Sequence, residues 1–547
     1  MGNRKGRNIR DNLFVLNAVL NASKSKNEEP LDIGVYDVRK CFDTMWAQEA
    51  VNDMYELGFQ NDKLLLVHKA NEYANIAVKT PTGMSERADI RNTIMQGTVW
   101  AGISCTATMD KLGKLLYKNP HDAYKYKGKV VVPPLEMVDD VLTISKCGTT
   151  SIAMNQMVNQ FMKSKKLQLN PLKCAKIHIG KKCSECPDLL VNNESMKNSD
   201  REKYLGDIIQ KDGKQHATIV ERISKGYGIV ANILALLSDI PLGHRKIETG
   251  LELRQAWLLN GILYNSEIWQ KITEKDKSDL MKIDKYLLRS ILGAHSKTPL
   301  EQLHLETATL SIPQIIATRR MIYLQTILKR PKGELIRNIY EAMIEDPLPG
   351  DWCQQIQNDF EKINLYMNNK LIETMNEDEY KVLIKNKVKE EAFKEFKNMQ
   401  AGHQKGNTLY HEDLKRPQTY LMTNKLNNNQ VSLLFNLRTQ CVRGIKDNFH
   451  GQNYQDLKCD LCENEIDTQK HILECHVLKK HLHWNHEEIK YEHIFGTLKQ
   501  QISVIILISS LLEVRDGLLE EGTVGWEPPA VLGGGLLYSS LTPTPPT

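Results

Sequence analysis

The stretch LEMVDDVLTI, residues 135 to 144, places two adjacent aspartates, Asp139 and Asp140, inside an otherwise apolar run. Burial of an unpaired carboxylate is costly, and burial of two neighbouring like charges without a cation costs more. The flanking segments VVVPPLEM and VLTIS are typical of β-strands, so the pair is predicted to lie at a tight reversal between two strands. At such a turn the two carboxylates either face water or hold a metal ion.

A third acidic residue is predicted at a comparable strand end. LDIGVYDV, residues 31 to 38, alternates apolar and other residues and favours a strand that ends near Asp37, with Phe42 and Asp43 shortly after. Mg²⁺ in proteins takes one or two carboxylates together with substrate phosphates. Two strand ends that bring three aspartates together would suit two-metal phosphoryl transfer.

Length, composition and net charge limit the classes of protein to which the chain can belong. The chain has 547 residues, so it is predicted to divide into three or four domains, and 41% hydrophobic with 25% charged residues is ordinary for a globular protein. The net charge is only +5, so nucleic-acid binding has to be argued locally. Residues 163 to 182, KSKKLQLNPLKCAKIHIGKK, hold seven lysines and no acidic residue. This lysine cluster is either a solvated face or a phosphate-binding surface.

The compartment and the domain order follow from segment patterns. Met1 is followed by GNRKGRNIRDN rather than an apolar segment, and the eleven cysteines fit a reducing compartment, so an intracellular protein without disulfides is expected. ISVIILISSLL, residues 502 to 512, is too short for a membrane span and is interpreted as a core helix. Strands and helices alternate to about residue 210, with an amphipathic helix over 152–170 ending at Asn170. Helices are predicted over 216–330 and 380–400, and a disordered tail over 521–547.

The segment CDLCENEIDTQKHILEC contains the pattern C-x₂-C-x₈-H-x₃-C. Three thiolates and one imidazole at this spacing can close a tetrahedral zinc site, and the predicted ligands are Cys459, Cys462, His471 and Cys475. Nearby histidines could compete as ligands, namely His476, His481, His483 and His486. A second pattern, C-x₃-H-x₄-C-x₂-C at Cys174, His178, Cys183 and Cys186, is interpreted as strand sequence rather than a zinc site.

The order of the motifs carries a family resemblance. Gln96 and Gly97 open a predicted helix between the acids, and LQLNPLKCAKIHIG and KYLGDIIQKDG follow them. This succession resembles reverse transcriptases, specifically the polymerase of non-LTR (LINE-type) retrotransposons, from about Lys5 to about Asp516. A similar CCHC zinc element follows the polymerase in many members of that family.

The resemblance implies a role for each matched residue. Asp37, Asp139 and Asp140 would hold catalytic Mg²⁺ (or Mn²⁺), with Lys173 as a further catalytic residue. Phe42 would lie under the sugar and select deoxynucleotides. The remaining substrate-binding residues would be Gln96 and Gly97 at the template and nucleotide turn, Asn170 in the next palm motif, and Tyr204, Leu205 and Gly206 in a primer-grip-like hairpin.

The implied fold is α+β: a right-hand polymerase palm, an antiparallel sheet with helices, with partial fingers, a helical thumb and connector, and a small zinc module. The expected boundaries are 1–30 for a remnant of the fingers, 31–215 palm, 216–330 thumb, 331–450 connector, 451–490 zinc module, 491–520 C-terminal helix and 521–547 disordered tail. The implied activity is RNA-directed DNA synthesis on a primer 3′ hydroxyl.

The implied partners and location follow from that activity. The partners would be an RNA template, a DNA primer or target and deoxynucleotide triphosphates, with no membrane and no oligomeric state indicated. The location would be the nucleus or cytoplasm, within a ribonucleoprotein, and the protein would not be secreted.

The sequence departs from the family at two places. Its opening resembles the segment just before the first palm aspartate, so most of the fingers is expected to be missing, and Arg4, Lys5 and Arg7 would remain on a mobile terminus. Met137 also stands where relatives carry an aromatic residue. The alternative function is therefore a non-catalytic nucleic-acid-binding remnant that uses the lysine cluster and the zinc module.

Overall fold

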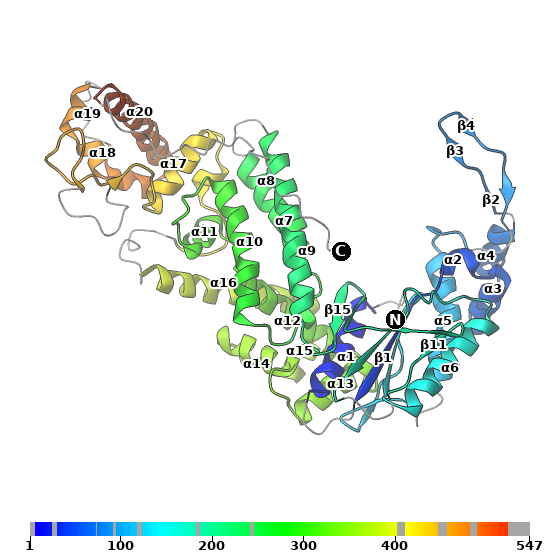
Figure 1. Cartoon of the computed structure of the whole chain (residues 1–547). Helices are drawn as coiled ribbons and strands as arrows, with labels where there is room; N and C mark the ends of the chain where they lie inside the picture. The colour runs from blue at the N-terminus through cyan, green and yellow to red at the C-terminus, as the bar shows by residue number, and fades with distance from the viewer. Residues whose placement is uncertain are drawn as a thin grey trace.

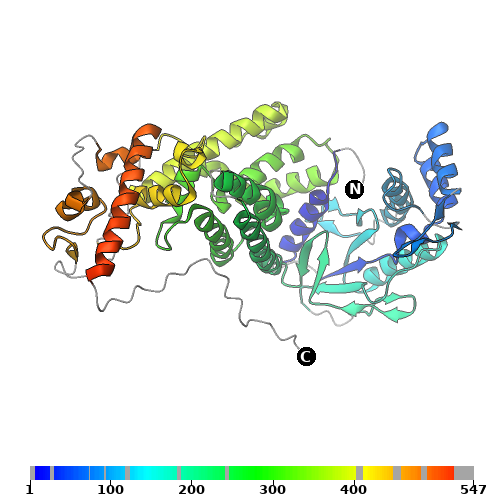
Figure 2. The same cartoon turned by 90° about the horizontal axis from the view of Figure 1, so that it is seen from above.

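The computed structural model describes residues 6–24, 30–72, 74–90, 94–117, 123–181, 186–240, 245–401, 411–446, 457–481 and 489–522. Some residues singled out above lie outside these ranges, namely Arg4, Lys5, Cys183, His483, His486 and most of the predicted tail. In Figure 1 and Figure 2 the N-terminal elements and the C-terminal helices form the two ends of an elongated molecule.

A five-stranded sheet organises the N-terminal region. Its order is β13 (Lys197–Asn198), β10 (Ala175–Ile179), β1 (Leu31–Tyr36), β9 (Asp140–Lys146) and β8 (Leu135–Met137). Strand β1 is antiparallel to both β9 and β10, and β10 is parallel to β13. The predicted strand over 31–37 and the predicted reversal at 139–140 are both present.

Side chains alternate along a strand, so those on the two faces of the sheet pack in two different hydrophobic cores. Leu31 and Ile33 pack in a core shared with α1 (Ile9–Ala22) and the following helices. Tyr36 and Val141 pack on the other face against α5 (Ala101–Tyr117) and α6 (Thr149–Ser164). Helix α6 ends before the predicted stop, because Lys166 takes a left-handed conformation with φ 58°.

Small elements complete this region. Helices α2 (Cys41–Thr44), α3 (Ala47–Glu56) and α4 (Asp62–Glu72) follow β1, and two short ladders form an extension beyond them (Figure 1): β2 (Asn75–Ile76), β3 (Lys79–Thr80), β4 (Gly83–Met84) and β5 (Ala88–Asp89). The other two-stranded ladders pair β6 (Lys125–Tyr126) with β7 (Val130–Val131), β11 (Leu190–Val191) with β12 (Glu194–Ser195), and β14 (Arg201–Tyr204) with β15 (Asp207–Gln210).

Helices dominate after β15, as predicted for 216–330. The first group is α7 (His216–Ser238), α8 (Arg245–Leu253), the π-helix η1 (Arg254–Leu259), α9 (Asn260–Ile262), the 3₁₀ turn η2 (Ser266–Ile268), α10 (Glu274–Leu292), α11 (Leu300–Thr307) and α12 (Ile312–Leu328). The second group is α13 (Leu335–Glu345), α14 (Trp352–Lys362), α15 (Asn369–Thr374) and α16 (Glu377–Ala401).

Helix α1 is fixed between the sheet and these helices, so the expectation of a mobile N-terminus is wrong for the described residues. Arg7 forms an ion pair with Glu334, and Arg10 Nη1 lies 2.6 Å from Glu267 Oε1. The buried Asp11 accepts a hydrogen bond from Arg330 Nη2 at 2.9 Å. The ion pair with Glu334 therefore commits Arg7 to a structural contact, and the other long-range ion pairs hold the helix that follows it.

The C-terminal part consists of η3 (Thr419–Met422), α17 (Asn428–Arg438), α18 (His471–Glu474), α19 (His476–His481), η6 (Tyr491–Phe495) and α20 (Leu498–Gly522). The apolar run at 502–512 is part of α20, whose Val504, Ile505 and Ile508 are fully buried. No described helix combines the length and the hydropathy of a membrane span.

Candidate active site and zinc centre

Strand pairing brings the three predicted metal aspartates to one edge of the sheet. Tyr36 pairs with Val141 in the β1–β9 ladder, so Asp37 and Asp140, the next residues outward, stand side by side. Met137 pairs with Asp140 in the β8–β9 hairpin, and Val138 takes a left-handed φ of 60° to make the tight turn. Asp139 therefore lies at the tip of the hairpin.

The electrostatics of this edge show an excess of negative charge. Burial raises the pKa of the Asp139 carboxyl, and the charge of Asp37 raises it further. Asp140 is exposed at the start of β9, yet the surrounding protein partly desolvates its carboxyl, and this desolvation, followed by the charges of Asp139 and Asp37, raises its pKa to about 6. The donor set consists of carboxylate oxygens, which suits Mg²⁺ or Mn²⁺, and a divalent cation would neutralise the repulsion.

The three carboxylates do not form one compact ligand set in this conformation. Their carboxylate oxygens are not all within 4.8 Å of one another. The ligand atoms of two other groups, Cys459 with Cys462, His471 and Cys475, and Asp32 with Cys147, His178 and Cys186, do meet this distance. The cation near Asp37 is Lys173, whose Nζ lies 3.6 Å from Asp37 Oδ1.

Backbone hydrogen bonds tie the Asn170 loop to Asp37. The N–H of Asn170 donates to the carbonyl of Asp37 at 2.9 Å, and Val38 forms an isolated bridge with Leu169. The carbonyl of Asn170 accepts from the N–H of Lys173 at 3.0 Å. The predicted palm residues Asn170 and Lys173 thus lie beside the predicted metal ligand.

Two further predicted substrate residues are linked to this edge. Phe42 lies in α2 and is half-buried against the core that contains Tyr36. Its carbonyl accepts a hydrogen bond from the N–H of Ile94 at 2.8 Å, which anchors the segment that leads to Gln96 and Gly97. Gln96 and Gly97 form an exposed turn before α5, and the φ of 87° at Gly97 favours glycine there.

The predicted hairpin at 204–206 is present, and its Tyr204 side chain is engaged within the protein. Leu205 and Gly206 form the β14–β15 turn with φ values of 48° and 88°. Tyr204 is buried, and its hydroxyl donates to the carbonyl of Leu135 at 2.7 Å. The Tyr204 side chain therefore supports β8, and the predicted contacts of this hairpin with a primer remain a prediction.

Sequence reasoning missed two residues that shape the site. Asn12 in α1 donates through Nδ2 to the carbonyl of Glu136 at 3.0 Å, which anchors the β8 arm of the hairpin. The buried Cys174 accepts a hydrogen bond from the N–H of Asp37 at 3.4 Å. Cys174 was interpreted only as part of a cysteine and histidine pattern and Asn12 stands in no motif, so tertiary packing alone brings them to Asp37 and the hairpin.

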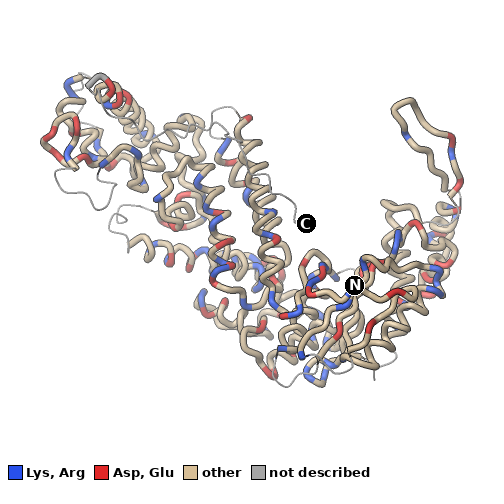
Figure 3. The backbone as a smooth tube through the Cα atoms, viewed as in Figure 1, with Lys and Arg blue, Asp and Glu red and all other residues tan. Residues whose placement is uncertain are grey.

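Several lysines of the cluster at 163–182 form ion pairs, so the cluster is not one continuous basic surface. Lys165 donates to Asp53 Oδ1 at 2.8 Å, and Lys176 is 2% exposed with its Nζ 3.5 Å from Asp32 Oδ2. Lys173 approaches Asp37, and Lys182 lies outside the described residues. Figure 3 shows Lys and Arg interspersed with Asp and Glu along the chain. Folding therefore uses several of these lysines in ion pairs.

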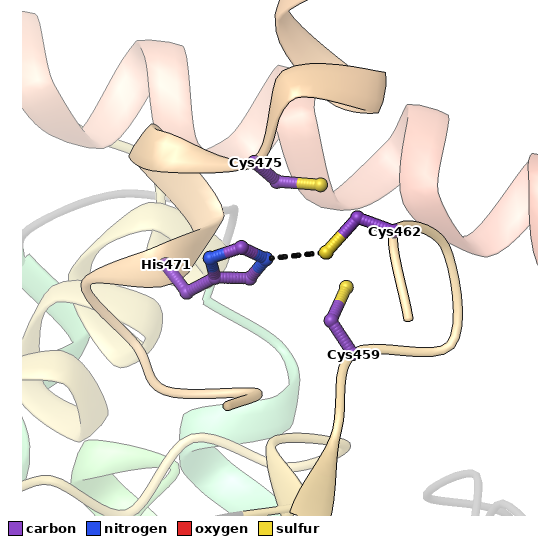
Figure 4. A group of neighbouring side chains, drawn as sticks. All are labelled: Cys459, Cys462, His471 and Cys475. Atoms are coloured by element: carbon purple, nitrogen blue, oxygen red, sulfur yellow. Dashed lines mark hydrogen bonds between the residues drawn. The ribbon is translucent and has the colours of Figure 1, made fainter. Parts of the chain in front are cut away.

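The four predicted zinc ligands converge (Figure 4). The Sγ atoms of Cys459, Cys462 and Cys475 and a ring nitrogen of His471 all lie within 4.8 Å of one another, and all four residues are buried. Cys462 Sγ is 3.4 Å from His471 Nε2. Ligands of a tetrahedral zinc ion are separated by roughly 3.3–3.8 Å, so this geometry fits zinc.

The protonation tendencies of the cluster also suit a metal. Burial lowers the pKa of His471, which keeps the imidazole neutral, and burial raises the pKa of Cys459 to about 11. Burial alone would raise the pKa of Cys462, but the backbone N–H groups of Glu465 and Asn464 and the neighbouring thiols lower it. A bound Zn²⁺ would deprotonate the thiols, as zinc does in structural sites.

The competing histidines lie outside this cluster as far as the structure describes them. His476 and His481 are exposed on α19 and do not join the four ligands. The cluster is attached to α20 by a buried ion pair, Arg515 Nη2 to Asp467 Oδ2 at 2.8 Å.

Comparison with solved structures gives weak similarities. The telomerase of Candida tropicalis with the TWJ fragment of telomeric RNA shares 14% identity, with 62% of this chain and 52% of that chain covered and a TM-score of 0.30. The corresponding Candida albicans telomerase shares 11% identity with the same coverage and TM-score. Apo telomerase from Candida tropicalis shares 14% identity, with 60% of this chain and 56% of that chain covered and a TM-score of 0.29. The chain spans about half the length of these proteins.

The comparison with curated proteins gives no match. The comparison with protein families matches residues 1–209 to the family described as reverse transcriptase (RNA-dependent DNA polymerase). That range contains Asp37, Asp139 and Asp140 and the hairpin at 204–206. Residues 1–209 of this chain are therefore similar to the reverse transcriptase family.

Proposed function

We propose that the chain is the RNA-directed DNA polymerase of a non-LTR retrotransposon and extends a primer 3′ hydroxyl on an RNA template by two-metal nucleotidyl transfer. The observation that carries this proposal is the placement of Asp37 beside Asp140, with Asp139 at the adjoining hairpin tip, within the residues that match the reverse transcriptase family.

Each residue has a defined task in this proposal. Asp37 and Asp139 would hold the divalent metals, and Asp140 would support them. When bound, Mg²⁺ or Mn²⁺ would lower the pKa of the primer hydroxyl and neutralise charge on the triphosphate. Phe42 packs below the sugar, where its ring would clash with a 2′ hydroxyl. Lys173 lies close enough to Asp37 to contact a phosphate bound to the same metals.

The assignment to a non-LTR element rests on the order of the modules. The CCHC cluster at 459–475 follows the polymerase domain and the intervening helices, as the resemblance implies. In this proposal the zinc module binds nucleic acid, and the protein acts inside the cell as part of a ribonucleoprotein. Template RNA, primer or target DNA and deoxynucleotide triphosphates are its partners.

The second candidate is a nucleic-acid-binding protein without polymerase activity. The observation that favours it is the commitment of Arg7 to Glu334, which removes this arginine from any role in clamping a triphosphate. The engagement of Lys165 and Lys176 in ion pairs reduces the basic surface available to either function.

Primer extension decides between the two candidates. The full chain, an RNA template with a DNA primer, deoxynucleotide triphosphates and Mg²⁺ or Mn²⁺ should give products that are lost in Asp139→Ala. Asp43→Ala is a matched control, because Asp43 is exposed near the same strand end but is not among the predicted ligands. Salt-sensitive binding of the template-primer without Asp139-dependent extension would support the second candidate and contradict the first.

A further inference from the structure

A second cluster of metal-binding side chains lies on the face of the sheet that packs against α6. Asp32 on β1 pairs with His178 on β10 and with Ser145 on β9, so these three side chains share that face. Cys147 follows β9 two residues after Ser145, and its N–H donates to the carbonyl of Pro30 at 3.0 Å, which continues the ladder. The register thus sets Cys147, Asp32 and His178 in a row.

Cys186 completes this group, which we call the Asp32 cluster: Asp32, Cys147, His178 and Cys186. One ligand atom from each residue lies within 4.8 Å of every other. Cys186 Sγ is 3.5 Å from His178 Nδ1, inside the roughly 3.3–3.8 Å that separates ligands around a tetrahedral zinc ion. Four residues from separate segments of the chain therefore converge on one point.

The hydrogen bonds of His178 prepare one ring nitrogen for a cation. His178 Nε2 lies 3.1 Å from the carbonyl of Lys181 and must donate to it, because a carbonyl oxygen only accepts. In the neutral ring Nδ1 then carries the lone pair, and it faces Asp32 Oδ1 at 2.9 Å and the sulfur of Cys186. Two acceptors at 2.9 Å require a proton or a metal ion between them.

Charge balance favours a divalent metal. Asp32 is 1% exposed, and its Oδ2 has Lys176 Nζ at 3.5 Å but makes no hydrogen bond among the described residues. With both cysteines as thiolates the cluster carries three negative charges, and Lys176, which is 2% exposed with its Nζ 3.4 Å from Cys186 Sγ, supplies one positive charge. A divalent cation brings the sum to zero, which is the state that a buried site tolerates best.

We propose that the Asp32 cluster binds one Zn²⁺ through two thiolates, one imidazole and one carboxylate. Mixed sulfur and nitrogen ligands in four-fold coordination select zinc over Mg²⁺ or Ca²⁺. Cys186 is exposed and Cys147 is half-buried, so the ion can enter from solvent, and the two thiol protons leave to solvent on binding. The ion would join β1, β10, the residue Cys147 that follows β9, and Cys186.

This site is separate from the proposed catalytic metals. Asp32 and Asp37 stand at opposite ends of β1, five residues and roughly 16 Å apart along the strand. The catalytic edge offers oxygen ligands only, whereas the Asp32 cluster is rich in sulfur and nitrogen. The proposal therefore stands whether or not the chain is a polymerase.

The test uses the full chain, stripped with a chelator under reducing conditions and titrated with Co²⁺, whose thiolate complexes absorb in the near ultraviolet. The wild-type chain should bind two equivalents with thiolate absorption. The first double variant, Cys147→Ser with Cys186→Ser, should bind one equivalent of Co²⁺ with thiolate absorption. The second double variant, Cys459→Ser with Cys462→Ser, should also bind one equivalent. Cys441→Ser, outside both clusters, should still bind two. One thiolate-bound equivalent in the wild type, retained in the first double variant, would overturn the proposal.

A second measurement needs no substitution and covers the case in which a variant fails to fold. In zinc-loaded wild type, alkylation of Cys147 and Cys186, mapped by mass spectrometry, should be at least tenfold slower than after chelation. Equal alkylation rates with and without zinc would contradict the proposal. A Cys147–Cys186 disulfide that persists with zinc and mild reductant present would also contradict it, because the same two sulfurs cannot serve as thiolate ligands.

Discussion

Lys173 Nζ lies 3.6 Å from Asp37 Oδ1, at the edge of the sheet where strand pairing sets Asp37 beside Asp140. The lysine offsets part of the negative charge, yet the pKa of Asp140 is still raised to about 6 by desolvation and by its two acidic neighbours. The site therefore holds more negative charge than its own cation neutralises, and two predictions follow from this imbalance.

Metal-dependent activity should fall as the pH is lowered through about 6, because protonated Asp140 is a poor metal ligand. Primer extension at subsaturating Mg²⁺, measured between pH 5.5 and 8, should rise with pH and then level off. Raising Mg²⁺ should shift the profile to lower pH, since the metal competes with the proton. A profile that is flat across pH 6 at low Mg²⁺ would contradict this assignment.

The same carboxyl should make the metal-free protein less stable as the pH rises. Its folded-state pKa of about 6 exceeds the value of about 3.9 for an unperturbed aspartate, so the folded state holds more protons between these values and loses stability as the pH increases through them. Without divalent metal, Asp140→Asn should therefore raise the melting temperature at pH 7.5. At pH 4, where the native carboxyl is already protonated, it should have little effect. Asp43→Asn is the matched control, and an equal rise there would point to a general charge effect.

Phe42 should control the choice of sugar. Replacement by Val removes the ring proposed to clash with a 2′ hydroxyl, so incorporation of ribonucleotides relative to deoxynucleotides should rise by about tenfold or more. Phe42→Tyr keeps the ring and should preserve the ratio. The measurement is kcat/KM for both nucleotide types on one template. If the ratio does not change in Phe42→Val, the ring is only a packing residue of the adjoining core.

Tyr204→Phe should lower stability without affecting primer binding. The variant loses the hydrogen bond from its hydroxyl to the carbonyl of Leu135, a bond worth about 1 kcal/mol in the free energy of unfolding. Denaturant unfolding and primer affinity should be measured together. Tyr227→Phe, at an exposed position of α7, is the control and should change neither. A loss of primer affinity with unchanged stability would show that the Tyr204 hydroxyl contacts the primer after all.

The zinc module should lose its structure when one buried ligand is removed. Cys475→Ser should release one equivalent of zinc and speed hydrogen exchange in residues 457–481, because so short a segment has little apolar core of its own. Exchange in β1 and β9 should stay unchanged. His476→Asn, at the exposed next position, should retain the zinc, and a loss of metal there would show that a different histidine is the ligand.

Local pattern by itself determined much of this protein. The β8–β9 hairpin and the strand that ends before Asp37 follow from alternation and turn residues, which act over a few neighbouring positions. The hairpin at 204–206 was predicted from the family resemblance, and it is present. The convergence of Cys459, Cys462, His471 and Cys475 was equally predictable, because their spacing lets a short segment close on itself.

Only the tertiary structure decided which distant side chains meet. The register of β1 between β9 and β10 brings Asp32, Cys147 and His178 together and leaves Cys174 beside Asp37, so the apparent C-x₃-H-x₄-C-x₂-C pattern is divided between two places. The burial of Tyr204, the pairing of Arg7 with Glu334 and the engagement of Lys165 with Asp53 have the same origin. Each of these contacts joins segments far apart in the chain, and sequence periodicity carries no information about which of them will pack against each other.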